Sequence, residues 1–138
     1  MPKIEYKTSI EKLSPNNLGG FFVGWKNKPS IEKHLAVLQN SNHVVLAIND
    51  KQVVGYITAI TDKTLSAYIP FLEVLPKFKG QGIGKELVYR MLAILKDYYM
   101  IDLLCDTDLQ KFYEKFDMKK AQGMCIRNYS NQNGDIKP

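Results

Sequence analysis

Three glycines at alternate positions follow an apolar, strand-like segment and lead directly into an amphipathic helical pattern. Residues 72–88 read Leu-Glu-Val-Leu-Pro-Lys-Phe-Lys-Gly-Gln-Gly-Ile-Gly-Lys-Glu-Leu-Val. A bend of this kind leaves backbone N–H groups unpaired at a helix N-terminus, where the helix dipole also favours an anion. Glycine permits a positive φ and lets a ligand approach where a Cβ would block it. Because Lys77, Lys79 and Lys85 add positive charge around the bend, the pattern predicts a site for phosphate or pyrophosphate.

The spacing of this loop departs from two common phosphate-binding motifs. A P-loop needs glycine, four residues and then Gly-Lys-Ser/Thr, but Gly84-Lys85 is followed by a glutamate and Lys79 stands where the first glycine belongs. The dinucleotide fingerprint G-x-G-x-x-G also fails, because the three glycines give G-x-G-x-G. A nucleotide-binding domain that mimics the loop, and a strand-to-helix turn without a ligand, remain open alternatives.

The motif that does match is (Arg/Gln)-x-x-Gly-x-(Gly/Ala), with Lys79, Gly82 and Gly84 in the three fixed places. With these residues the loop resembles the acetyl-CoA loop of the GNAT superfamily of N-acetyltransferases, although Lys79 departs from the usual Arg or Gln. The segment Val74-x-Pro76 precedes the loop, where the superfamily ends its fourth strand.

A second segment extends the resemblance, which covers residues 52–118. Residues 109–118, Leu-Gln-Lys-Phe-Tyr-Glu-Lys-Phe-Asp-Met, are similar to the superfamily's second landmark, an aromatic pair with a tyrosine on a short helix. Asp117 and Met118 stand where Gly-Phe is usual, and Asp106 stands in place of a common Asn. These departures concern local contacts with coenzyme A and leave the implied fold unchanged.

The resemblance implies transfer of an acetyl group from acetyl-CoA, as co-substrate, to a primary amine by direct attack, with no metal. Tyr113 would then be the acid for the departing thiolate, although it also suits a core aromatic. Glu73 is a candidate base, with a surface salt bridge as its other interpretation and with Asp102 or a water chain as alternatives for the role. A backbone N–H near Val74, at a bulge in the strand before the loop, would stabilise the oxyanion.

The residues implied to hold acetyl-CoA lie on that strand and on the loop. They are Leu72, Val74, Lys79, Gly80, Gln81, Gly82, Ile83, Gly84 and Lys85. Phe21, Phe22 and Trp25 fall where the superfamily has its acceptor-site loop, so they would form an acceptor pocket or simply belong to the core.

Several functional questions stay open at this level. The acceptor would be a small-molecule amine or a protein amine, and the acyl group acetyl or longer. A non-catalytic acyl-CoA sensor or interaction module on the same fold is the alternative from a different class. A homodimer is compatible with the resemblance, since dimers are common in the superfamily.

Composition narrows the function classes further. The chain has 138 residues, of which 45% are hydrophobic and 24% charged, as is ordinary for a globular domain. The net charge of +5 comes from lysines spread among carboxylates, so we expect no nucleic-acid partner. There is no apolar run long enough for a membrane span and no signal-peptide pattern at the start, so we expect no membrane partner and a cytoplasmic location. Cys105 and Cys125 read as buried thiols, and no Cys/His cluster has metal-ligand spacing.

The elements that must position these residues indicate one α+β (mixed α/β) domain over residues 1–129, followed by a polar, frayed tail over residues 130–138. The resemblance implies a GNAT-type fold, with a mostly antiparallel sheet, one splayed parallel strand pair and flanking helices. Ser30 is the expected N-cap of a helix that reaches residue 40. The remaining helices are expected over residues 82–96 and 109–116, the latter capped by Asp106 or Thr107. The strands are expected over residues 3–8, 43–48, 52–61, 65–75 and 99–105, with 99–105 central and buried, and residues 119–129 are expected to give one or two closing strands.

Overall fold

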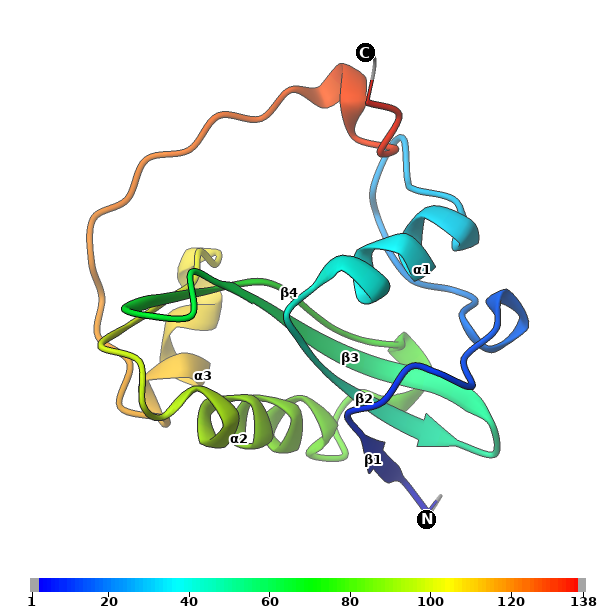
Figure 1. The fold of residues 1–138 in the computed structure, drawn as a ribbon, viewed down its shortest axis with the longest axis horizontal. Helices are drawn as coiled ribbons and strands as arrows, with labels where there is room; N and C mark the ends of the chain where they lie inside the picture. Colours follow the sequence, from blue (N-terminus) through cyan, green and yellow to red (C-terminus); the bar gives the residue numbers. More distant parts are fainter. Residues whose placement is uncertain (1–2, 137–138) are drawn as a thin grey trace.

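The computed structural model describes residues 3–136 and contains a five-stranded sheet in the order β1-β2-β3-β4-β5. The first four strands pair antiparallel, whereas β5 runs parallel to β4. Helices cover both faces of the sheet (Figure 1), and this arrangement confirms the predicted mixed α+β fold class. The strands are β1 (Glu5–Lys7), β2 (His43–Asn49), β3 (Gln52–Thr61), β4 (Ser66–Val74) and β5 (Met100–Asp102), and the α-helices are α1 (Ile31–Asn40), α2 (Ile83–Leu95) and α3 (Gln110–Glu114).

Local sequence signals explain several of these boundaries. The Ser30 side chain accepts a hydrogen bond from the Lys33 amide, as an N-cap should, so α1 begins where it was predicted. Asp50 and Lys51 between β2 and β3 both have positive φ (47° and 69°). That combination is typical of the two-residue type I′ hairpin turn, whose twist matches the flanking strands.

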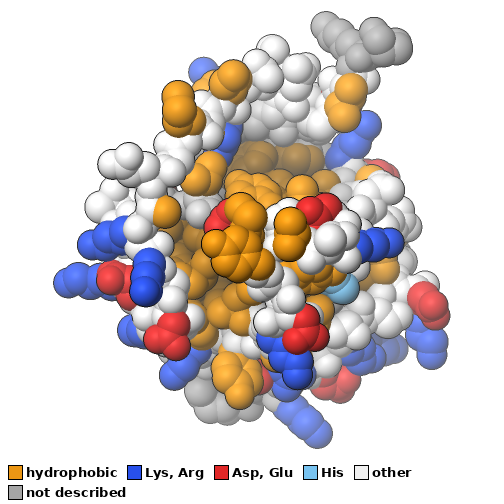
Figure 2. All heavy atoms as spheres, turned by 60° about the vertical axis from the view of Figure 1, so that its left-hand side comes forward, with side chains coloured by type: hydrophobic (Ala, Val, Ile, Leu, Met, Phe, Trp, Pro, Cys, Tyr) orange, Lys and Arg blue, Asp and Glu red, His pale blue; other side chains and the backbone are white. Residues whose placement is uncertain are grey.

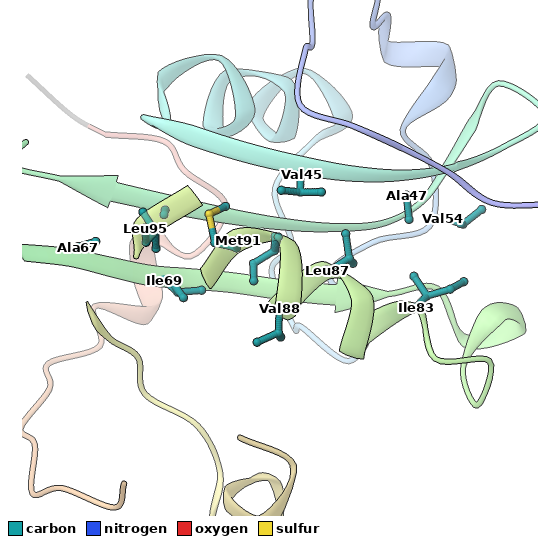
Figure 3. Close-up of a cluster of buried hydrophobic side chains, with 12 residues drawn as sticks. Val45, Ala47, Val54, Ala67, Ile69, Ile83, Leu87, Val88, Met91 and Leu95 are labelled. Carbon is teal, nitrogen blue, oxygen red and sulfur yellow. The ribbon is translucent and has the colours of Figure 1, made fainter. Parts of the chain in front are cut away.

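Helix α2 packs its apolar stripe onto one face of the sheet (Figure 3). Gly55 on β3 allows this close approach, because a Cβ there would lie 3.2 Å from both the Ile83 Cγ2 and the Leu87 Cδ1 atoms. Leu92, which follows Met91 on the same helix, is only partly buried. The side chains of this first core come from the central strands and α2: Val45, Ala47, Val54, Ile57, Ala59, Ala67, Ile69, Ile83, Leu87, Val88, Met91 and Leu95.

A second core occupies the opposite face of the sheet, below α1 and the loop that precedes it. Its buried side chains are Leu18, Phe21, Phe22, Leu38, Val44, Leu46, Val53 and Tyr56. Residues 14–29 therefore close one face of the sheet as turns and loops, with a single 3₁₀ turn at Pro15–Asn17.

Two predictions about the C-terminal third are wrong. Residues 99–105 were expected to form a central, buried strand, but β5 is short, lies at the sheet edge and leaves Met100 43% exposed. Residues 119–129 were expected to close the sheet, but 119–128 run as extended chain without strand pairing, and every residue from 119 to 131 is exposed. In Figure 1 this stretch is the long orange arc that bridges α3 and the end of the chain. An apolar alternation predicts a strand only where a neighbouring strand is in reach to pair with it.

Two smaller differences from the predictions lie in the same region. The predicted helix over residues 109–116 is a 3₁₀ turn at Thr107–Leu109 followed by α3, and Asp106 makes no side-chain capping bond. Cys105 is half-buried and Cys125 is exposed, so the expectation of two buried thiols is wrong.

The residues after 128 turn back towards α1. Tyr129–Asn131 form a 3₁₀ turn. The Asn27 amide donates a hydrogen bond to the Gln132 Oε1 atom at 2.9 Å, and the Lys33 Nζ atom lies 3.8 Å from the Asp135 Oδ1 atom.

No helix within residues 3–136 is long and apolar enough to cross a membrane.

Candidate functional site

The glycine loop ends in a row of unpaired backbone amides at the start of α2. Gly80 and Gly82 have φ of 79° and 83°, and Gly82 is the N-cap of the helix. The first helical bond runs from the Glu86 amide to the Gly82 carbonyl at 3.1 Å. Within residues 3–136 no group accepts a hydrogen bond from any amide between Gly80 and Lys85. Amides left free at a helix N-terminus are the donors that an anionic group binds.

The charge around these amides is positive. Lys77, Lys79 and Lys85 are exposed, and none of them forms an ion pair with another described residue. Gly82 has open space around the position where a Cβ would project, with no atom within 4 Å. The loop therefore combines free donors, positive charge and room for a ligand.

The end of β4 offers a second set of free backbone groups. The Leu75 amide donates to the Val54 carbonyl at 2.8 Å. Because hydrogen-bonded pairs alternate along an antiparallel ladder, the backbone groups of Leu72 and Val74 point away from β3 and towards the β5 side. The β4–β5 ladder ends at the pair Tyr68–Asp102, so beyond this point β5 does not pair with that edge of β4.

Gly84 marks the point where the loop, β4 and α3 meet. A Cβ on Gly84 would lie 3.8 Å from Phe112 Cζ and 3.8 Å from Val74 Cγ2. Tyr113 follows Phe112 on α3, and their ring centroids are 5.0 Å apart. The three segments singled out in the sequence thus converge on one region.

The Tyr113 phenol is half-buried and packs beside the first core. Burial, and then the charge of the nearby Cys105, raise the pKa of Tyr113 to about 12. The phenol therefore carries its proton throughout the neutral range, as a group that donates a proton must.

Glu73 faces the other side of β4 from Leu72 and Val74, because side chains alternate along a strand. Its carboxylate accepts hydrogen bonds from the Phe22 amide at 2.9 Å and from the Val23 amide at 3.2 Å. It makes no ion pair with any described residue, so the salt-bridge interpretation finds no partner. Instead, Glu73 ties the loop of residues 18–25 to the strand.

No pattern in the sequence points to these two amide donors. Phe22 has a φ of 61°, which a non-glycine residue seldom adopts, and this turn aims its amide at the carboxylate. Its partner lies 51 residues further along the chain, so no local pattern could have revealed the pair. The neighbouring Gly20 and Gly24 (φ 91° and 84°) signal a turn but not its partner.

An aromatic cluster lies behind that loop. Phe21 and Phe22 are buried, whereas Trp25 is 39% exposed. His34 from α1 sits among the rings, with its ring centroid 4.8 Å from that of Phe22 and 4.5 Å from that of Tyr56. His34 is 2% exposed, its Nε2 atom has no hydrogen-bond partner in the described residues, and burial lowers its pKa to about 4.

The bulge expected near Val74 lies earlier on β4, so that prediction is wrong in position. The β3–β4 register passes from Thr58 opposite Phe71 to Ile60 opposite Tyr68, which leaves one extra residue on β4. Pro70 lies within this interval and cannot donate to the ladder, which favours a break in register there. Asp102, the alternative base, is exposed at the end of β5.

Comparison with known proteins agrees with this geometry. Residues 10–118 match the acetyltransferase (GNAT) family. A crystal structure from Deinococcus radiodurans, provisionally named an acetyltransferase, is 42% identical with a TM-score of 0.93 and covers 97% of this chain and 94% of that one. That match takes in nearly the whole chain.

Two curated relatives cover less of their own length. The N-acetyltransferase Ycf52 of Pyropia yezoensis is 29% identical over 99 residues, which are 67% of this chain and 56% of that protein. A chloroplastic GCN5-related N-acetyltransferase of Arabidopsis thaliana is 39% identical over 75 residues, which are 53% of this chain and 32% of that protein. The chain thus spans about half, or less, of the length of the curated relatives it matches.

Proposed function

The chain belongs to the acetyltransferase (GNAT) family, and from that premise we propose that it transfers an acetyl group from acetyl-CoA to a primary amine by direct attack. The observation that carries this proposal is the row of unpaired amides from Gly80 to Lys85 beside the free edge of β4. One anionic and one extended polar ligand segment would be bound side by side there. A pyrophosphate joined to a pantetheine arm has that shape and chemistry.

The residues present fit acetyl-CoA. The amides of Gly80, Gln81, Gly82, Ile83, Gly84 and Lys85 would hold the pyrophosphate, and Lys79 and Lys85 would add charge. The backbone groups of Leu72 and Val74 would pair with the pantetheine arm along β4. When bound, acetyl-CoA supplies a thioester whose carbonyl carbon a neutral amine attacks and whose thiolate leaves. No metal ion is needed in this scheme.

Tyr113 would act as the acid. Its raised pKa keeps the phenol protonated, and α3 brings it next to the position where the loop and β4 meet. By protonating the sulfur, the phenol would make it a better leaving group. A positioned general acid raises the rate by about 10²–10⁴-fold.

Glu73 would receive the proton that the incoming ammonium must lose. Each carboxylate oxygen already accepts one amide hydrogen bond, and each keeps one lone pair for a substrate or a water. The loop that it holds carries Phe22 and leads to the half-exposed Trp25, so an amine bound at this loop would lie close to the carboxylate. The acceptor is either a small-molecule amine or a protein amine.

A second candidate is a non-catalytic acyl-CoA-binding module. It is favoured by the same two hydrogen bonds at Glu73, since both carboxylate oxygens are already engaged by the Phe22 and Val23 amides and the side chain holds that loop in place. Such a module would bind acetyl-CoA through the same loop and would transfer nothing.

The proposal is tested first at the level of binding. Purified protein is titrated with acetyl-CoA, CoA, ATP and NAD in parallel, and its melting temperature is followed. A ligand at 100 times its Kd adds about 2.7 kcal/mol of stability, so acetyl-CoA and CoA should raise the melting temperature while ATP and NAD should not. Stabilisation by ATP or NAD, and not by acetyl-CoA or CoA, would contradict the proposal.

A matched pair of variants then assigns binding to the loop. Gly82→Leu should abolish stabilisation by CoA, because its side chain would stand beside the unpaired amides. Gly24→Leu is the control, since Gly24 has a φ of 84° and the same open surroundings, so its backbone strain should be similar. Equal CoA binding by the two variants would show that the loop serves only as a turn. An amine-acceptor screen with acetyl-CoA then separates transfer from binding without transfer.

A further inference from the structure

The two cysteines of the chain line one groove from opposite walls. Cys105 lies just after β5, and Cys125 belongs to residues 119–127, called here the C-terminal segment. The groove has a volume of about 1010 Å³ and lies between the end of β5, α3 and this segment. Seen from this side, hydrophobic side chains line a hollow in the surface (Figure 2). Cys105 is half-buried and Cys125 is exposed, so a small reagent can reach both thiols.

A contact close to both cysteines joins the two walls. A Cβ on Gly123 would lie 3.1 Å from the Leu104 Cδ2 atom. Cys105 is the residue after Leu104, and Cys125 stands two residues after Gly123. Side chains two residues apart in extended chain project to the same side, so the Cys125 side chain projects to the side on which Leu104 lies. Met124, between them, projects to the other side and is 99% exposed.

The C-terminal segment is fixed at its ends and not along its length. It follows α3, and beyond it the Asn27 amide donates to Gln132 while Lys33 lies beside Asp135. No backbone–backbone hydrogen bond joins residues 119–127 to another described residue, so this stretch can shift at little cost. A disulfide needs its two Cα atoms within about 7 Å. A shift of the segment alone would bring them into that range, because the contact is one residue from one cysteine and two from the other.

The surroundings of the two thiols differ. Burial, and then the charges of Asp106 and Asp108, raise the pKa of Cys105, which makes it the slower nucleophile. Cys125 is exposed, and Arg127 follows two residues later and forms no ion pair with another described residue. A free positive charge of this kind attracts an anionic reagent. An anionic oxidant would therefore react first at Cys125.

We propose that Cys105 and Cys125 form a reversible disulfide that fastens the C-terminal segment to the end of β5 and closes the groove beside Tyr113. An accessible thiol with a second thiol close by is typical of redox-sensitive pairs. Tyr113 lines the same groove, so the bridged segment would cover the phenol on that side. The oxidant is a small disulfide that carries negative charge, such as oxidised glutathione.

The reaction consists of two thiol–disulfide exchanges. The Cys125 thiolate attacks one sulfur of oxidised glutathione, the S–S bond of the reagent breaks, and the first glutathione leaves with the proton that Cys125 lost. The Cys105 thiolate then attacks the Cys125 sulfur of the mixed disulfide, and the second glutathione leaves in the same way. The two cysteines lose two electrons in total, and the reagent gains them as two thiols. An excess of dithiothreitol reverses both steps.

The bridge is tested on the full chain at low protein concentration. The protein is incubated with oxidised glutathione, free thiols are blocked with iodoacetamide, and the chain is digested with trypsin without reduction. We expect the peptide of residues 97–111, which contains Cys105, to be linked to the peptide of residues 121–127, which contains Cys125, and the two to separate on reduction. A mixed disulfide that persists at Cys125, or a bridge between two chains on a non-reducing gel, overturns the proposal.

A matched variant tests the geometry. Cys125→Ser combined with Met124→Cys moves the thiol by one residue, to the side of the segment that points away from Leu104. This variant should stop at the mixed disulfide and lose the bridge, as should Cys105→Ser, which lacks the second thiol. If the thiol at position 124 bridges as readily as Cys125, the facing arrangement is refuted and the proposal falls with it.

The effect of the bridge on catalysis rests on the proposed function. The oxidised chain should lose acetyl transfer to an accepted amine, and dithiothreitol should restore it, whereas Cys125→Ser should keep its rate under both conditions. A fully bridged chain with an unchanged rate overturns the closure beside Tyr113. A reduced chain that transfers nothing contradicts the proposed function, and the linked peptides still decide whether the bridge forms.

Discussion

Mild acid should destabilise this fold through His34, a buried side chain that must stay neutral. Its imidazole is 2% exposed, lies among the rings of Phe21, Phe22 and Tyr56, and has an unpartnered Nε2 atom. A proton added at Nε2 would place a charge in apolar surroundings without a hydrogen-bond acceptor. Burial accordingly lowers the pKa of His34 from 6.5 to about 4.

The sign and size of the effect follow from linkage. Between pH 6.5 and pH 4 the unfolded chain binds a proton at this histidine and the folded chain does not, so the free energy of unfolding falls as the pH falls. The stabilising contribution is complete above pH 6.5 and is lost by about pH 4. Since one pKa unit corresponds to about 1.36 kcal/mol, the loss amounts to roughly 3 kcal/mol.

The assay is urea unfolding followed by circular dichroism at pH 7 and at pH 4, on the wild type and on His34→Leu. The wild type should lose roughly 3 kcal/mol more than the variant between the two pH values. His43→Leu serves as the control, because His43 lies at the start of β2 and is only half-buried. Asp62, whose pKa is lowered by hydrogen bonds from the Ser66, Thr64 and Leu65 amides, titrates below this window. Equal losses in the wild type and His34→Leu would refute the reasoning.

Two predictions concern the proposed chemistry. Tyr113→Phe should lower the turnover of an accepted amine about 10²–10⁴-fold while CoA binding survives, whereas Tyr89→Phe, at a 65% exposed position on α2, should change neither. Because the pKa of Tyr113 is about 12, the wild-type rate should not fall with rising pH below about pH 11, and a fall in that range would point to another acid. Glu73→Gln should loosen the Phe22 turn and cost about 1–2 kcal/mol of stability through one lost amide acceptor, measured by thermal unfolding. If it leaves turnover unchanged at saturating amine, Glu73 holds the loop and is not the base.

The first hundred residues show how far local signals reach. Ser30 predicted the start of α1, because an N-cap acts through backbone groups within a few residues. The stripe from Ile83 to Leu95 predicted α2 because it repeats with the period of a helix. These features need no knowledge of distant chain, and the structure confirms each of them.

In the candidate site, too, the features that depend on neighbouring residues could be predicted and those that depend on distant residues could not. The glycine loop could be found from sequence because its donors lie on consecutive residues. The position of Glu73 could not, because its two amide donors come from a loop about fifty residues earlier that depends on a positive φ at Phe22. The bulge was misplaced for a related reason, since a register shift belongs to a pair of strands and not to one of them.

The two errors in the C-terminal third share one physical origin. Residues 99–105 and 119–129 were both predicted as strands, yet both leave apolar side chains in contact with water. Tyr99 is 84% exposed, Leu104 47% and Ile126 84%. Strands with apolar side chains are expected where a partner is present to bury them. A strand-like sequence therefore shows only that a segment can adopt extended chain, and whether it pairs depends on the strand that the rest of the chain brings alongside, which within residues 3–136 is absent for residues 119–128.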